Sequence, residues 1–144
     1  MRHLTAIGAL ALVVALTALP ASVAAQTSNA GTSLGNVRLV RSVMANGAPL
    51  AAGTYQVRLS SDPLQPGVGQ SPDSERYVEF VRGGKVVARE VATVVSNADI
   101  GTLAKGKKPA AGTATVELLK GNDYLRVWIN RGGTNYIIHL PVGS

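Results

Sequence analysis

The residue types best suited to binding chemistry gather toward the C-terminal end of the sequence. Tyr124, Arg126 and Trp128 alternate along one stretch, and Glu117 and His139 lie in the stretches before and after it. Aromatic rings on either side of a charge-assisted pair form a surface on which sugar rings, peptides or a partner protein can stack. We therefore predict a binding face made of Trp128, Tyr124, Arg126, Glu117 and His139.

A structural interpretation of the same residues stands beside this one. A second sheet or a long loop would cover the face, and Trp128, the one Trp of the sequence, would belong to the core. Large aromatic side chains are usually well buried, which favours this alternative for the indole.

Few residues have the spacing that catalysis requires. His139 leaves a small hydrolase as an alternative function. However, no G-x-S-x-G elbow accompanies this residue, and a single His cannot hold zinc. Glu75 and Glu79 would stand about 13 Å apart along a strand, farther than the carboxylates of glycosidases. The chain has no Cys, so thiolate metal sites, Cys nucleophiles and disulfides are excluded. We expect no enzyme, no catalytic residue, no metal and no cofactor.

A second cluster of chemistry-bearing residues is the basic loop formed by Lys105, Lys107 and Lys108. The preceding stretch, 101–107, matches the phosphate-loop pattern G-x-x-x-x-G-K. The match fails because Lys108 occupies the position of the magnesium-binding Ser or Thr, and Pro109 follows where a helix should begin. We interpret the three lysines as a loop able to touch an anionic surface.

Two hairpin turns would position the binding face. Gly121 with Asn122, and Gly132 with Gly133, have the composition of two-residue turns. Their register places Glu117 beside Arg126 and Arg126 beside His139 on one side of a three-stranded meander. A slip of one residue would mix the two faces, so the agreement of both turns supports this register. The other side then carries three apolar rows: Leu118, Leu125 and Leu140; Val116, Val127 and Ile138; Ala114, Ile129 and Tyr136.

The rest of the chain has the pattern of short strands separated by turns and two long loops. Alternating or β-branched runs predict strands over 37–44, 54–60, 76–81 and 86–95, with loops over 61–74 and 96–112. Asn46 with Gly47 is expected to turn the first strand toward the second, and Gly83 with Gly84 to join the third and fourth. We predict an all-β fold, a single antiparallel β-sandwich or small barrel of about seven strands with a C-terminal three-strand meander. A barrel whose cavity, lined by Val116, Val127 and Ile138, carries an apolar ligand is a further alternative.

The N-terminal residues match an export signal. A polar start, an apolar run from Leu4 to Leu19 and small residues ending at Ala25 predict a signal peptide over 1–25. We expect a flexible lead over 26–36 and one β domain over 37–144. The cleaved chain is then not transmembrane, and it is periplasmic or secreted. Without Cys it is not a lipoprotein. Its thirteen basic and eight acidic residues, a formal charge of +5, weakly favour anionic partners over any specific nucleic acid.

The stretch from Leu50 to Val57 resembles the L-x-x-G-x-Y-x-V corner of secreted bacterial β-sandwich modules, including carboxypeptidase-regulatory-like and prealbumin-like domains. With the Asn46 turn and the G-K-V-V-A stretch that begins at Gly84, the order of features is similar to small uncharacterised exported proteins of soil bacteria. The resemblance implies a stalk, spacer, adhesion or binding accessory and brings no catalytic residues. From the residues themselves, the hydroxyl of Tyr55 is expected to reach back to a carbonyl near the corner.

Together these patterns predict an exported, non-enzymatic binding or structural module of the bacterial cell envelope or exterior. Its partner would be a protein, a polysaccharide or an anionic envelope surface. The composition leaves the oligomeric state open.

Overall fold

The computed structural model describes residues 31–143 except 63, 66 and 72. The predicted signal peptide and residues 26–30 of the predicted lead lie outside the described residues. Along the described chain the elements are β1 (Ser33–Leu39), β2 (Val43–Ala45), β3 (Ala48–Leu50), β4 (Gly53–Leu59), β5 (Glu75–Arg82), β6 (Lys85–Ser96), α1 (Ile100–Leu103), β7 (Thr113–Leu118), β8 (Tyr124–Arg131) and β9 (Thr134–Pro141).

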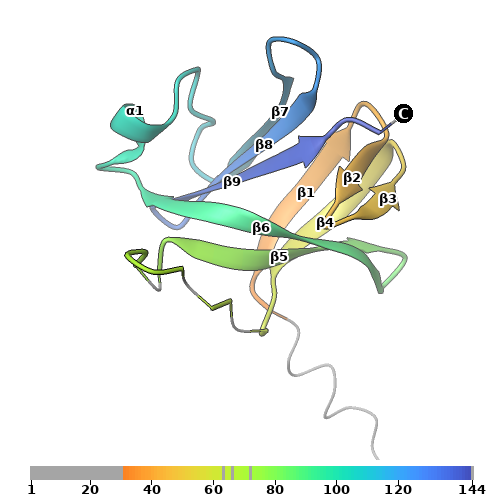
Figure 1. The fold of residues 1–144 in the computed structure, drawn as a ribbon, viewed down its shortest axis with the longest axis horizontal. Coiled ribbons are helices and arrows are strands. Elements are labelled where there is room, and N and C mark those ends of the chain that lie inside the picture. The colour runs from red at the N-terminus through yellow and green to blue at the C-terminus, as the bar shows by residue number, and fades with distance from the viewer. Residues whose placement is uncertain (1–30, 63, 66, 72, 144) are drawn as a thin grey trace, which may run out of the picture.

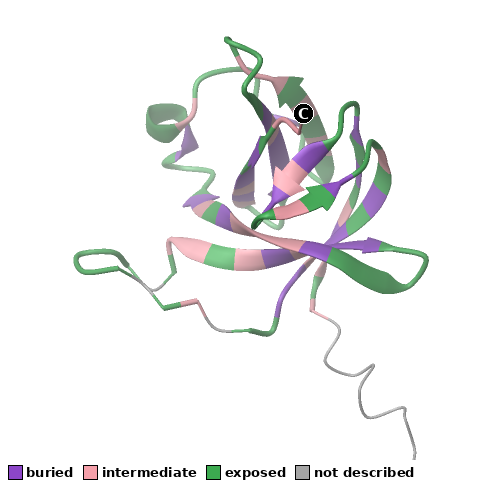
Figure 2. Cartoon of the chain, turned by 45° about the vertical axis from the view of Figure 1, so that its right-hand side comes forward, coloured by how far each residue is buried: buried purple, intermediate pink, exposed green. Residues whose placement is uncertain are grey.

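One antiparallel sheet forms the body of the molecule. Its strand order is β1-β4-β5-β6-β9-β8-β7, and β2 pairs with β3 in a separate small hairpin. The large sheet curls until β1 approaches β7, so it is nearly closed into a barrel (Figure 1). The predicted all-β fold is therefore confirmed, in the barrel form. Buried and exposed residues alternate along most strands, as expected for a sheet with one face turned inward (Figure 2).

The C-terminal meander has the predicted register. Leu118 pairs with Leu125, and Leu125 pairs with Leu140; the other two apolar rows follow in the same register. Glycines 132 and 133 both have positive φ, 61° and 77°, as a two-residue turn of this type requires. The first turn differs in detail from the prediction, because the N–H of Asn122 donates to the carbonyl oxygen of Leu119 at 3.0 Å and the turn is therefore centred on Lys120 and Gly121. The register on either side of it is nevertheless the predicted one.

The first strand differs from the prediction. The expected single strand over 37–44 is divided into β1, which begins earlier at Ser33, and β2. The chain leaves the sheet at Val40, which is 63% exposed, and β2 pairs with β3 and bridges Val142 near the C-terminus. The Asn46 turn therefore closes the small β2–β3 hairpin and does not lead directly into β4. Ser33 to Asn36, expected as part of a loose lead, are extended because they pair with β4.

The middle of the chain follows the prediction, with two additions. Gly83 and Gly84 join β5 to β6, and no strand or helix interrupts the described residues between β4 and β5. A register shift between Phe80 and Val81 explains why the alternation of β5 is blurred: both side chains are buried although they are neighbours. The short helix α1 lies in the predicted loop 96–112 and was not expected from the sequence.

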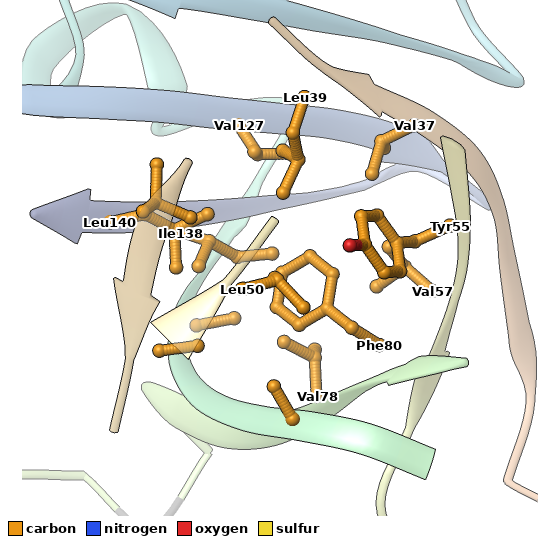
Figure 3. Packing of buried hydrophobic residues seen from close by; sticks show 14 of the residues in the cluster. Val37, Leu39, Leu50, Tyr55, Val57, Val78, Phe80, Val127, Ile138 and Leu140 are labelled. Carbon is orange, nitrogen blue, oxygen red and sulfur yellow. The ribbon is translucent and has the colours of Figure 1, made fainter. Parts of the chain in front are cut away.

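The core lies inside the curled sheet and under the β2–β3 hairpin. Side chains from β1, β3, β4, β5, β8 and β9 point toward one another there (Figure 3). The ring of Tyr55 packs edge-on against Phe80, with ring centroids 6.2 Å apart. The Tyr55 hydroxyl donates a hydrogen bond to the carbonyl oxygen of Ala51 at 2.6 Å, so the predicted corner contact is confirmed.

Candidate functional site

The outer face of the meander brings the predicted charged residues together. Arg126 on β8 lies opposite Glu117 on β7 and opposite His139 on β9. The Nη2 of Arg126 donates to the Oε2 of Glu117 at 2.7 Å. The guanidinium carbon also lies 5.2 Å from the ring centroid of Trp128, close enough for a cation–π contact. The row of three charged or polar side chains is therefore present as predicted.

Trp128 does not belong to an exposed binding face, and this part of the prediction is wrong. Its side chain is 2% exposed and packs with Val95, Ile100 and Ile137 in a second hydrophobic cluster. The reason is α1, which places Ile100 over the outer side of β8 and β9. The structural alternative for the indole is the correct one: a long loop covers that part of the face.

Two buried asparagines hold the covering loop in place. Asn135 accepts from the indole N–H of Trp128 at 2.9 Å and donates to the Oδ1 of Asn97 at 2.8 Å. Its cross-strand neighbour Asn130 donates to the carbonyl oxygen of Pro109 at 2.9 Å. The Oδ1 of Asn130 is buried and has no hydrogen-bond partner among the described residues. These residues were missed because their partners Asn97 and Pro109 lie in the loop 96–112, whose path over the sheet could not be predicted from the sequence.

The basic loop and the meander face form one surface. Gly106, which lies between Lys105 and Lys107, packs directly against Arg126: a Cβ added to it would lie 2.8 Å from the Nη2 of Arg126. All three lysines of the loop are exposed, and none of them takes part in the ion pairs found among the described residues. The sequence had treated these as two separate sites, and the structure joins them at Arg126.

We define the basic face by its members: the three lysines, the Arg126–Glu117 pair, His139 and Tyr124. The Arg126 side chain is only 11% exposed and its charge is matched by Glu117. It therefore supports the face and is not free to bind a ligand by itself. Within this face, the cations that form no ion pair with a described residue are the three lysines of the loop. Tyr124, 47% exposed, supplies an aromatic ring on the same strand as Arg126.

His139 is an exposed residue whose titration reflects its surroundings. Partial burial lowers the pKa of its imidazole from 6.5, and the positive charge of Arg126 lowers it further. Both effects disfavour the imidazolium ion. The side chain is therefore mainly neutral at pH 7 and gains charge only in more acidic solution.

The remaining sequence motifs are explained by the fold. The phosphate-loop match at 101–107 begins inside α1 and is followed by β7, whereas a phosphate loop connects a strand to a following helix. Among the described residues, no group of three or more His, Cys, Asp or Glu side chains could hold a metal ion. Val127 and Ile138 are fully buried in the main cluster, and Val116 packs against it.

A separate open pocket lies at the β2–β3 hairpin. Its volume is about 570 Å³, and it contains none of the predicted site residues. Its lining is mainly apolar and comes from the two hairpin strands and the C-terminal segment: Ser42, Val43, Met44, Pro49, Leu50, Ala51 and Gly143.

Comparisons with known proteins give no relative from which a function of this site could be inferred. In the part of the chain that the structure describes, no helix has the length and apolar character needed to cross a membrane. Neither a protein-family model, nor a curated protein, nor a solved structure matches the chain.

Proposed function

We propose that this protein is an exported, non-enzymatic binding module of the bacterial envelope or exterior, and that the basic face is its contact surface. The observation that carries the proposal is the packing of Gly106 on Arg126. It places the loop that carries the three exposed lysines against the Arg126–Glu117 pair. Lysines that form no ion pair among the described residues suit a partner that carries anionic groups on a broad surface.

An acidic polysaccharide or an anionic envelope surface is the partner class that this charge favours. Each lysine near an anionic membrane surface contributes about 1 kcal/mol, and the attraction decreases as salt screens it. The binding is therefore expected to weaken steeply with ionic strength. A protein partner with an acidic patch would be recognised by the same charges.

The test measures binding of the purified protein to polygalacturonate and, separately, to vesicles containing anionic phospholipid, at several salt concentrations. A variant with Lys105→Gln, Lys107→Gln and Lys108→Gln should lose most of the affinity for the probe that binds. The control removes the same charge elsewhere, through Arg38→Gln, Arg41→Gln and Lys85→Gln, at three exposed positions outside the basic face. Equal loss in both variants, or no binding to either probe, would contradict the proposal.

A hydrolase that uses His139 is the rival function. The lowered pKa of His139 leaves its imidazole mainly neutral at pH 7, as a general base requires. Arg126 lies opposite His139 on the neighbouring strand. Replacing His139 with Ala separates the two functions. A hydrolase would lose its turnover of ester or glycoside substrates, whereas a binding module would keep most of its affinity for the anionic probe.

A carrier of an apolar ligand is the second rival. It needs an internal cavity lined by Val116, Val127 and Ile138, and the packing of these side chains in the main cluster speaks against one. Titration with a hydrophobic dye tests this rival. A carrier would bind the dye at a saturable interior site and release it when an apolar ligand is added. The module that we propose would show no saturable binding of the dye.

A further inference from the structure

Among the described strands, β7 ends the large sheet and has one edge without a strand partner. It pairs with β8 on one side, and on the other side the described sheet ends. β1, the outer strand at the opposite end of the sheet, comes near β7 but forms no ladder with it. An open edge of this kind presents main-chain donors and acceptors that another extended chain can satisfy.

Two hydrogen bonds at the start of β8 show which residues of β7 direct their main-chain groups toward the open edge. The N–H of Leu119 donates to the carbonyl of Tyr124 at 2.9 Å, and the N–H of Val142 donates to the carbonyl of Asp123 at 2.8 Å. In antiparallel ladders these directions alternate, so even-numbered residues of β8 bond to β7 and odd-numbered residues bond to β9. It follows that Ala114, Val116 and Leu118 direct their main-chain groups away from β8, toward the open edge.

The inner side chains of β7 are less buried than their neighbours on β8, although β1 lies near β7. Each inner side chain of β7 lies beside a side chain of β8 in the same apolar row, and that side chain of β8 is at most 1% exposed. The members on β7 are nevertheless only half-buried. The half-buried residues are Ala114, Val116 and Leu118, and their buried neighbours are Ile129, Val127 and Leu125.

The two outer strands differ in how they are protected against pairing. β1 has an irregular register between Ser33 and Gly35 and an exposed Arg38, which are features that discourage edge-to-edge association. β7 has the sequence TATVEL, without Lys, Arg, Pro or Gly. Its one charge, on Glu117, is matched by Arg126. β7 therefore lacks the features that keep β1 from pairing.

We propose that β7 pairs with β7 of a second copy of this chain, antiparallel and centred on Val116. In this register Ala114 lies opposite Leu118 of the second copy, so the apolar rows continue from one copy into the other. The three outward-directed residues of each copy then form about six main-chain hydrogen bonds. A shift by one residue would place apolar side chains opposite polar ones.

The register makes a charge-dependent prediction at Thr115, which lies opposite Glu117 of the second copy. Thr115→Glu places like charges opposite each other twice in the dimer, and Thr115→Lys places opposite charges there. At 0.2–1 kcal/mol for each pair, Thr115→Glu should raise the dimer dissociation constant about two- to thirty-fold, and Thr115→Lys should leave it unchanged or lower it.

Sedimentation velocity of the purified protein over a concentration series, up to the submillimolar range, tests the proposal. The matched control is Thr54→Glu, an exposed Thr on β4, a strand that is paired on both sides. A second variant, Val116→Pro, removes the central edge N–H and should abolish the dimer. The proposal is overturned if the protein stays monomeric throughout. It is also overturned if Thr115→Glu behaves like Thr54→Glu, or if both charges at position 115 weaken the dimer equally.

Discussion

Trp128 donates its indole N–H to the Oδ1 of Asn135 at 2.9 Å, and both side chains lie out of solvent beneath the loop that carries α1. The pair joins the meander to its covering loop, because the amide nitrogen of Asn135 also donates to Asn97. A polar side chain with no exposed surface is stable in this position only while its partners remain in place.

Asn135→Ala should therefore be strongly destabilising. The change leaves the indole N–H buried without an acceptor, which costs about 1–3 kcal/mol of the free energy of unfolding. Urea unfolding measures the loss, and the emission of Trp128 should shift to longer wavelength as the loop loosens. Asn36→Ala, at an exposed position on β1, is the control and should change little. Equal stability of the two variants would show that the buried pair is unimportant.

Tyr55→Phe tests the corner before β4. The substitution keeps the ring that packs on Phe80 and removes only the hydroxyl that donates to Ala51 at 2.6 Å. A hydrogen bond of this kind contributes about 0.5–1.5 kcal/mol, so the free energy of unfolding should fall by that amount. Tyr124→Phe removes an exposed hydroxyl and is the control. If both variants unfold at the same denaturant concentration, the corner bond adds no stability.

The stability of the protein should depend on pH through His139. Because the folded-state pKa lies below 6.5, the unfolded chain binds a proton more readily than the folded chain does. The free energy of unfolding should therefore decrease as the pH falls below about 6.5, and this contribution should level off below the folded-state pKa. Well above pH 6.5 the imidazole is neutral in both states and contributes no slope.

An NMR titration of the His139 ring gives the folded-state pKa directly, and chemical unfolding at several pH values gives the slope. His139→Gln removes the titrating group and should flatten this part of the profile. A midpoint at or above 6.5 in the folded protein would contradict the assignment of burial and Arg126 as the dominant influences.

The sequence was most informative where turn chemistry and alternation agreed. The glycine-containing turns at positions 121 and 132 fix the register of the whole meander, and the register places Glu117, Arg126 and His139 in one row. Tyr55 could be predicted for a similar reason, since its hydroxyl contacts a residue only four positions away in the chain.

The covering of Trp128 could not be predicted in the same way. α1 spans only Ile100–Leu103, which is too short for a helical period to be visible, and its contacts with β8 join residues far apart in sequence. The division of the first strand has the same cause. β2 is stabilised by β3 and by Val142, and the bridge to Val142 depends on the closed fold.

Gly106→Ala tests the contact that holds the basic loop on the meander. Gly106 has a φ of +120°, a conformation that costs other residues about 1–3 kcal/mol, and the new Cβ would lie 2.8 Å from the Nη2 of Arg126. The variant should be less stable in urea by about that amount.

Gly101→Ala is the matched control, because Gly101 lies in α1 and no atom lies near its added Cβ. Ala at this position should be neutral or slightly stabilising. Displacement of Arg126 in Gly106→Ala should also raise the pKa of His139 toward 6.5, whereas Gly101→Ala should leave this pKa unchanged. If the two variants have the same stability and the same His139 titration, the loop does not rest on Arg126, and the lysines and the meander do not form one surface.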